Sequence, residues 1–197
     1  AKFRNNGQVC ISPNRFYIQE SKKDEFVNKF IEKTKKLKIG NGMEQDVQLG
    51  PITTLKRLGE IEELVEITKK EGAKVLIGGK RPSGFNKGYF YEPTVFDDVD
   101  DNFTIMKTEP FGPLVPMLSF KSFDEVVERA NNNDLGLCSY IYTNSMEKAH
   151  KASELMETGC VAVNTPTVAI AEAPFGGIKQ TGYGREGGSM AIKDYLN

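Results

Sequence analysis

The stretch FRNNGQVC, residues 3–10, sets a cysteine directly behind a Gly-Gln pair and just ahead of an apolar strand pattern at 16–18. A cysteine thiol is already partly ionised near neutral pH, so Cys10 is a candidate nucleophile for a carbonyl carbon. Gly7 lets the backbone come close to a reactant, and the N–H of Cys10 can bind the oxyanion that such an attack forms. Most free cysteines are small buried apolar residues, and from the chemistry alone this plainer interpretation of Cys10 is the favoured one.

Outward from this stretch, hydrophobic patterns typical of strands alternate with patterns typical of helices. They predict strands at 14–19, 74–77, 89–96, 114–120, 136–143 and 160–163, and helices at 21–38, 53–70, 123–130 and 145–157. A short helix or strand is expected at 190–196. Strands and helices that alternate in this way predict an α/β fold, with a largely parallel sheet and flanking helices.

Single residues refine these predictions. Ser21 and Ser122 each stand where a helix N-cap is expected, and Ser122 opens the capping-box sequence SFDE. Pro93 cannot donate a hydrogen bond to a sheet ladder, so its strand is expected at an edge or at a bulge. Helical spacing over 145–157 predicts that Met146 is buried.

Composition narrows the classes of function. A length of 197 residues fits one sizeable domain or one domain with an appendage, and the net charge of −1 gives no general reason to bind nucleic acid or an anionic membrane. The 3 cysteines are far apart and odd in number, which argues against a disulfide framework or a zinc site and for a reducing compartment. No apolar run is long enough to span a bilayer, and the first residues have no signal-peptide character. A cytoplasmic location is therefore expected.

Two polar features have plain interpretations. The single histidine, His150, lies in a charged helical pattern and is expected at the surface. The acidic segment 97–102 is interpreted as a solvated turn in preference to a cation site.

Three motifs resemble signatures of one family. The pattern F-x-N-x-G-Q-x-C at 3–10, the string EPFGP at 109–113 and the string PFGGIK at 174–179 are similar, in this order, to segments of the aldehyde dehydrogenase superfamily. The resemblance covers essentially the whole chain but only the later, catalytic-domain portion of such an enzyme, most like succinate-semialdehyde dehydrogenase. It implies a thiol-bearing catalytic domain at 1–165. It also implies a C-terminal segment at 166–197 that returns toward the active site and is truncated before the oligomerisation strand.

The resemblance also assigns roles to residues. Cys10 would attack the aldehyde carbon to give a thiohemiacetal, hydride would pass to the nicotinamide ring of NAD or NADP, and water would hydrolyse the thioester. Glu109 would hydrogen-bond the ribose beside the nicotinamide, and Phe111 would pack against that ring region. Phe175 corresponds to an aromatic residue close to the substrate tunnel and the thiol. The plainer alternatives are an ordinary loop carboxylate for Glu109 and core packing for Phe175.

Arg4 resembles the arginine of enzymes that oxidise semialdehydes with a distal carboxylate, succinate semialdehyde above all. A guanidinium binds a carboxylate through two parallel charge-assisted hydrogen bonds, which supports this role. Those enzymes often carry a serine shortly before the Pro-Phe-Gly-Gly motif, whereas this chain has Ala-Ile-Ala at 169–171. A solvated surface arginine is the alternative.

In the family, the dinucleotide-binding domain, the general-base glutamate and the oxyanion-hole asparagine all precede the thiol segment. The resemblance therefore implies a fragment that binds NAD or NADP mainly through an absent domain and is inactive alone. The complete enzyme would act on a small carboxylate-bearing semialdehyde as a homo-oligomer, without nucleic acid or membrane as a partner. Two other classes stay open: a thiol acyl-transfer or esterase module with His150 as base, and a non-catalytic module in which Cys10 is inert.

Overall fold

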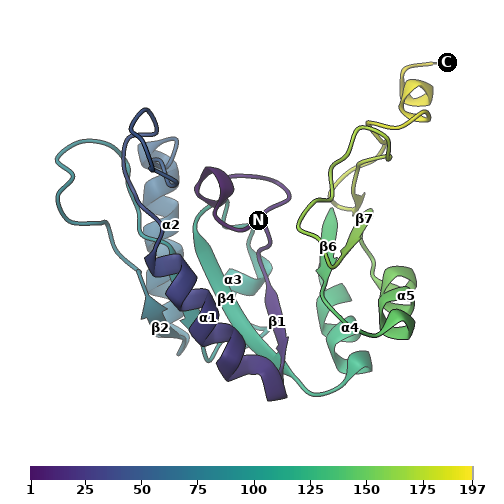
Figure 1. Ribbon diagram of the computed structural model, residues 1–197, viewed down its shortest axis with the longest axis horizontal. Helices are drawn as coiled ribbons and strands as arrows, with labels where there is room; N and C mark the ends of the chain where they lie inside the picture. Colours follow the sequence, from purple (N-terminus) through teal and green to yellow (C-terminus); the bar gives the residue numbers. More distant parts are fainter. Residues whose placement is uncertain (197) are drawn as a thin grey trace. The chain divides into compact units, whose positions relative to one another are not determined.

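The computed structural model describes residues 1–196, which form two compact units (Figure 1). The first unit comprises residues 2–121, and the second comprises residue 1 together with residues from 122 onward. The sequence suggested a different division, at 165/166, which stays a prediction. Asn197, the last residue of the predicted C-terminal segment, lies outside the described residues.

A four-stranded sheet forms the centre of the first unit. Its strands lie in the order β1-β4-β3-β2, and their bounds are Phe16–Gln19 for β1, Leu114–Phe120 for β4, Thr94–Asp97 for β3 and Lys74–Ile77 for β2. The pairs β1–β4 and β4–β3 are parallel, and β3–β2 is antiparallel. Helices flank this sheet, so the prediction of an α/β fold with a mostly parallel sheet is confirmed.

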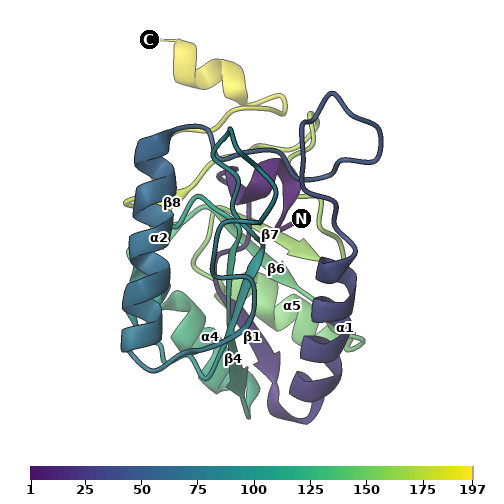
Figure 2. The ribbon, with the colours of Figure 1, turned by 90° about the vertical axis from the view of Figure 1, so that its left-hand side faces the viewer.

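Helices cover both faces of the sheet. Figure 2 shows α1 (Lys23–Lys35) and α2 (Leu55–Lys70) on opposite sides of it, and the short α3 (Thr104–Lys107) lies against α2. Successive side chains of a strand point to opposite faces, and β4 divides its residues accordingly. Leu114 and Leu118 pack with the apolar residues of α2, whereas Val115 and Met117 pack with Val27 of α1.

Two local predictions for this unit are wrong. Ser21 does not cap α1, because residues 20–22 form a 3-10 turn and the helix begins after Lys22 without a side-chain cap. The strand expected over 89–96 begins only at Thr94 and lies inside the sheet, not at its edge, although its pairing with β2 has the register shift of a bulge or irregularity. Pro93 stands just before that strand, where its missing N–H removes no ladder hydrogen bond.

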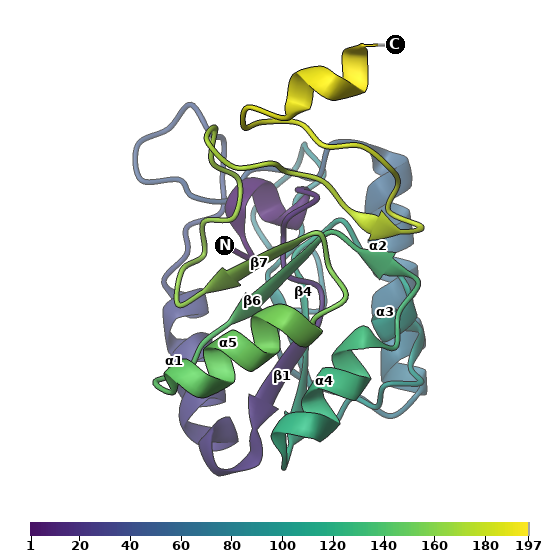
Figure 3. The same ribbon diagram turned by 90° about the vertical axis from the view of Figure 1, so that its right-hand side faces the viewer.

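The second unit contains shorter elements. It has the helices α4 (Phe123–Asn131) and α5 (Met146–Leu155), the parallel pair β6 (Cys138–Ile141) and β7 (Cys160–Val163), the antiparallel pair β5 (Leu135–Gly136) and β8 (Ile178–Lys179), and the 3-10 helix η3 (Ala191–Tyr195). Figure 3 shows α5 beside β7, with which it is in contact. Ser122 caps α4 in a complete capping box, which confirms that prediction.

The burial predicted for Met146 is wrong, since the residue is 86% exposed. The buried residue of α5 is Ala152, which lies six positions and therefore roughly 240° around the helix from Met146. No helix in the described part of the chain combines the length and the apolar character needed to cross a membrane.

Candidate functional site

The backbone before Cys10 has an unusual conformation. Asn5, Asn6 and Gly7 follow one another with φ angles of 45°, 57° and 76° in the left-handed region. Asparagine and glycine enter this region at the least cost, which explains why the turn carries these residues. Cys10 follows the turn with an exposed side chain, so the interpretation of Cys10 as a buried apolar residue is wrong.

Two buried side-chain amides anchor this turn to a distant part of the first unit. The Nδ2 of Asn6 donates a hydrogen bond of 3.0 Å to the carbonyl oxygen of Gly50. The amide of Gln8 bonds to residues 51 and 53 of the same segment. We call residues 3–10 the thiol loop and residues 50–53, which lead into α2, the anchor segment.

The thiol loop also packs directly against the segment that carries Glu109. A Cβ built on Gly7 would lie 2.1 Å from the carbonyl oxygen of Gly112, so only a hydrogen atom fits between the two backbones. The carbonyl of Pro113 then accepts a hydrogen bond from the N–H of Thr94, which ties the segment to β3. The structure thus brings two of the three sequence motifs together in one unit.

Glu109 and Phe111 differ in their surroundings. Glu109 is exposed, whereas the side chain of Phe111 is half-buried. Phe111 has a φ of 42°, which is rare for a residue with a bulky side chain and marks a constrained turn. An exposed Glu109 is compatible with a ribose ligand and with an ordinary loop carboxylate alike, so the cofactor roles of Glu109 and Phe111 stay predictions.

Lys2 is a buried charge that the sequence did not reveal. It is 4% exposed, its Nζ donates to Asn14 Oδ1 at 3.4 Å, and its carbonyl accepts a hydrogen bond from Ser12 Oγ. Burial lowers the pKa of Lys2 to about 7, although the negative charge of Glu109 partly raises it. Burial of a lysine depends on tertiary packing and leaves no periodic signal in a sequence.

The remaining predicted residues lie in different units. Arg4 is exposed and belongs to the thiol loop. Phe175 belongs to the second unit, where it is half-buried and pairs with Glu186 through two backbone hydrogen bonds. Its place beside the thiol stays a prediction. His150 is also in the second unit and is exposed, as expected from its charged pattern.

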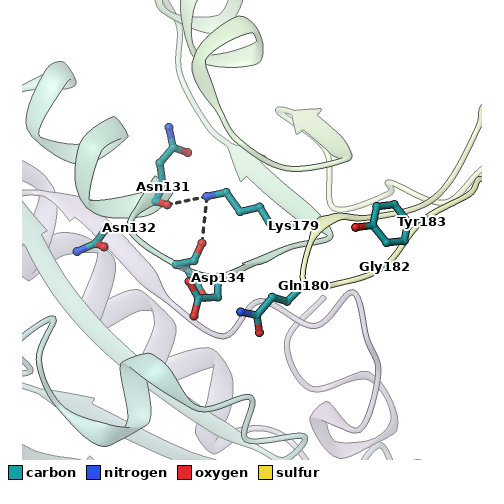
Figure 4. A pocket seen from close by; sticks show the side chains of 8 residues that line it. Asn131, Asn132, Asp134, Lys179, Gln180, Gly182 and Tyr183 are labelled. Carbon is teal, nitrogen blue, oxygen red and sulfur yellow. Dashed lines mark hydrogen bonds between the residues drawn. The ribbon is translucent and has the colours of Figure 1, made fainter.

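A cavity of about 610 Å³ opens on the second unit (Figure 4). The lining residues are mostly polar: Asn131, Asn132, Asn133, Asp134, Lys179, Gln180, Gly182 and Tyr183. Lys179 Nζ donates to the carbonyl oxygens of Asn131 and Asn133 at 2.8 and 3.0 Å and forms an ion pair with Glu157. The ammonium group of Lys179 is thus already paired within the chain. None of the predicted site residues lines this cavity.

The described residues hold no group of three or more His, Cys, Asp or Glu side chains placed to bind a metal ion. The predicted site residues of the first unit thus lie in the thiol loop and in the segment 109–113 that packs against it.

Comparison with known proteins agrees with this arrangement. A family model described as "Aldehyde dehydrogenase family" matches residues 1–197. Glutarate-semialdehyde dehydrogenase of Pseudomonas putida is 42% identical over 196 residues, and the NADP(+) succinate-semialdehyde dehydrogenase of Escherichia coli is 39% identical over 196 residues. Aldehyde dehydrogenase 1A1 of Bos taurus is 44% identical over 193 residues. These matches cover 98 to 100% of the chain but only 38 to 40% of each relative.

Solved structures give the same result. The NAD+ complex of an aldehyde dehydrogenase from Bacillus cereus superimposes with a TM-score of 0.94 at 39% sequence identity. The match covers 98% of this chain and 39% of that one. The chain thus spans about 40% of the length of the curated relatives it matches.

Proposed function

Because this chain belongs to the aldehyde dehydrogenase family, we propose that it is the thiol-bearing part of an NAD- or NADP-dependent enzyme that oxidises a carboxylate-bearing aldehyde to the acid. One observation carries the proposal. The exposed thiol of Cys10 follows a left-handed turn that packs, backbone against backbone, on the segment of Glu109 and Phe111.

Cys10 acts as the nucleophile in this proposal. Its thiolate attacks the aldehyde carbon and forms a C–S bond, while the carbonyl oxygen becomes an oxyanion that the N–H of Cys10 helps to bind. Loss of one such donor typically costs roughly 100- to 1,000-fold in rate. After hydride leaves the same carbon, the thioester on Cys10 reacts with water, which releases the carboxylic acid and restores the thiol.

Glu109 and Phe111 hold the cofactor in this proposal. The exposed carboxylate of Glu109 accepts hydrogen bonds from ribose hydroxyls, and the ring of Phe111 packs beside the nicotinamide. The bound cofactor supplies the acceptor for the hydride. Names of relatives support both NADP, as in the Escherichia coli protein, and NAD, as in the Bacillus cereus complex.

Arg4 recognises the distal carboxylate of the substrate. The two semialdehyde dehydrogenases named above support this substrate class. The bovine relative is 44% identical and is named only as an aldehyde dehydrogenase, so an aldehyde of another class is the alternative substrate.

The complete enzyme, in this proposal, is a homo-oligomer, and turnover needs residues beyond this chain, which spans only about 40% of its relatives. The chain alone is then expected to lack NAD-dependent turnover. A thiol esterase is less well supported, because these relatives are named dehydrogenases.

Replacement of the nucleophile tests the proposal. In the complete enzyme, Cys10→Ser should abolish aldehyde oxidation, whereas Cys138→Ser and Cys160→Ser should each retain it. Mass spectrometry of the wild type during turnover should show an acyl adduct on the peptide that contains Cys10. Full activity of Cys10→Ser, or an adduct elsewhere, would contradict the proposal.

A further inference from the structure

We propose that Thr53 is a positioning residue for the Cys10 thiol and that it acts through the side-chain amide of Gln8. This inference rests on the proposed role of Cys10 as the nucleophile. Thr53 itself does not need to touch the substrate.

The amide of Gln8 is held from both of its ends. Its Oε1 accepts two hydrogen bonds from Thr53, one from the backbone N–H at 2.8 Å and one from Oγ1 at 2.7 Å. Its Nε2 donates to the carbonyl oxygens of Asn5 at 3.2 Å and Pro51 at 3.4 Å. A side-chain amide has two donor hydrogens and two acceptor lone pairs, so these contacts use its whole capacity.

The contacts also fix the orientation of the amide. A backbone N–H can only donate, so the atom that faces Thr53 N–H has to be the oxygen of Gln8. Gln8 is 8% exposed, whereas its partner Thr53 is an exposed residue. Loss of the Thr53 hydroxyl therefore leaves the buried Oε1 of Gln8 with one donor, the N–H of Thr53, in place of two.

Thr53 is itself firmly placed. Its predecessor, Ile52, is fully buried in the core and donates its N–H to the carbonyl oxygen of Tyr89 at 2.9 Å. Its successor, Thr54, caps α2 by accepting a hydrogen bond from the N–H of Arg57 at 3.1 Å. Thr53 thus links the thiol loop to the core and to the first turn of a 16-residue helix.

The thiol loop needs such an external support. Its three successive left-handed residues are held by backbone hydrogen bonds that span only three residues, as in Gln8 N–H to Asn5 carbonyl. Gln8 precedes Cys10 by two residues, so a shift of the Gln8 side chain moves the thiol. A misplacement of about 1 Å at a reacting group can cost 100-fold in rate.

Two substitutions isolate the hydroxyl of Thr53. Thr53→Val keeps the shape of the side chain but removes the Oγ1 donor, and Thr53→Ser restores that donor. Thr54→Val is the matched control, because it removes the adjacent hydroxyl and weakens the cap of α2 without touching Gln8.

Steady-state kinetics of the complete enzyme give the first measurement. We expect Thr53→Val to lower kcat roughly tenfold or more with the KM of the aldehyde nearly unchanged, and Thr53→Ser to recover most of the loss. Thr54→Val should lose stability but keep kcat. Equal losses in Thr53→Val and Thr54→Val, or a wild-type kcat in Thr53→Val, would overturn the inference.

Hydrogen exchange of the 197-residue chain gives a measurement that does not depend on activity. Amides of the thiol loop should exchange faster in Thr53→Val than in the wild type, and at the wild-type rate in Thr53→Ser and Thr54→Val. Unchanged exchange in Thr53→Val would overturn the inference. An inactive wild-type enzyme would instead contradict the proposed function and leave this comparison intact.

Discussion

Gly7 and Gly112 meet backbone to backbone, with no room for a side chain between them. A Cβ on Gly7 would lie 2.1 Å from the oxygen and 2.6 Å from the carbon of the Gly112 carbonyl, and the φ of Gly7 is +76°. Sterics and backbone conformation therefore both demand glycine at this position. This contact joins the loop of the proposed nucleophile to the segment of the proposed cofactor ligands.

Gly7→Ala is expected to push these two segments apart. The substitution should destabilise the chain by about 2 to 4 kcal/mol, since the added methyl group clashes with rigid backbone and favours another φ. Urea unfolding of the chain measures the change. Gly42→Ala is the matched control, because nothing lies within 4 Å of a Cβ at Gly42. A Gly7→Ala variant as stable as the Gly42→Ala variant would show that the contact does not constrain the fold.

Gly59→Ala is expected to stabilise the chain, in contrast to Gly7→Ala. Gly59 is an exposed residue in the interior of α2, and a Cβ there would meet nothing within 4 Å. Alanine loses less conformational entropy on entering a helix, so the variant should be more stable by about 0.5 to 1 kcal/mol. Thermal unfolding followed by circular dichroism would detect the increase in Tm. A decrease would mean that α2 has a neighbour at this face.

The pH dependence of stability should report on Lys2. Its folded-state pKa is lowered to about 7, against 10.5 for an exposed lysine. Between these values the unfolded chain binds more protons than the folded chain, so the contribution of Lys2 to stability rises with pH across this window and is flat below it. At 1.36 kcal/mol per pH unit the rise is at most about 5 kcal/mol.

The substitution Lys2→Met isolates this effect. The free energy of unfolding should be measured in urea between pH 6 and pH 9.5 for both proteins, because other titrating groups contribute equally and cancel in the difference. As the pH increases above 7, the free energy of unfolding of the wild type should increase relative to that of Lys2→Met. Parallel curves would show that Lys2 keeps an ordinary pKa in the folded chain.

Arg4→Ala is expected to change the substrate preference of the complete enzyme. If Arg4 binds the distal carboxylate, the KM for succinate semialdehyde should rise roughly 10- to 100-fold, as for loss of charged hydrogen bonds. The KM for butanal, which has no carboxylate, should stay within about twofold of the wild type. The KM of Arg4→Lys for succinate semialdehyde should lie between those of the wild type and Arg4→Ala, since an ammonium keeps the charge but cannot form two parallel hydrogen bonds. Equal effects on both aldehydes would exclude the recognition role.

The sequence predicted the regular elements of the first unit well where local periodicity and packing agree. The strand at 114–120 has the bounds expected, and Leu58, Ile61 and Val65 form the buried stripe predicted for α2. The strand predicted at 89–96 is longer than the observed one, because Tyr91 is buried although its backbone is irregular. In the sequence, such a buried aromatic residue has the pattern of a strand residue. Burial alone does not distinguish these two states.

The candidate site was predictable only in part. The resemblance singled out Cys10 and Glu109, whose roles stay predictions, but neither Lys2 nor Thr53 belongs to a motif. Thr53 meets Gln8 across 45 positions, and contacts of this range leave no pattern in a single sequence. Such residues become visible only when the chain is folded.

A further contact extends the stack of Gly7 on Gly112 into the interior. A Cβ on Gly112 would lie 2.6 Å from Cδ1 of Ile61, which is fully buried in α2. The side chain of Ile61 thus supports the backbone of Gly112 from the side of the core. If Cys10 is the nucleophile, Ile61→Val is expected to lower both durability and turnover, because it removes the methyl group that lies beneath this contact.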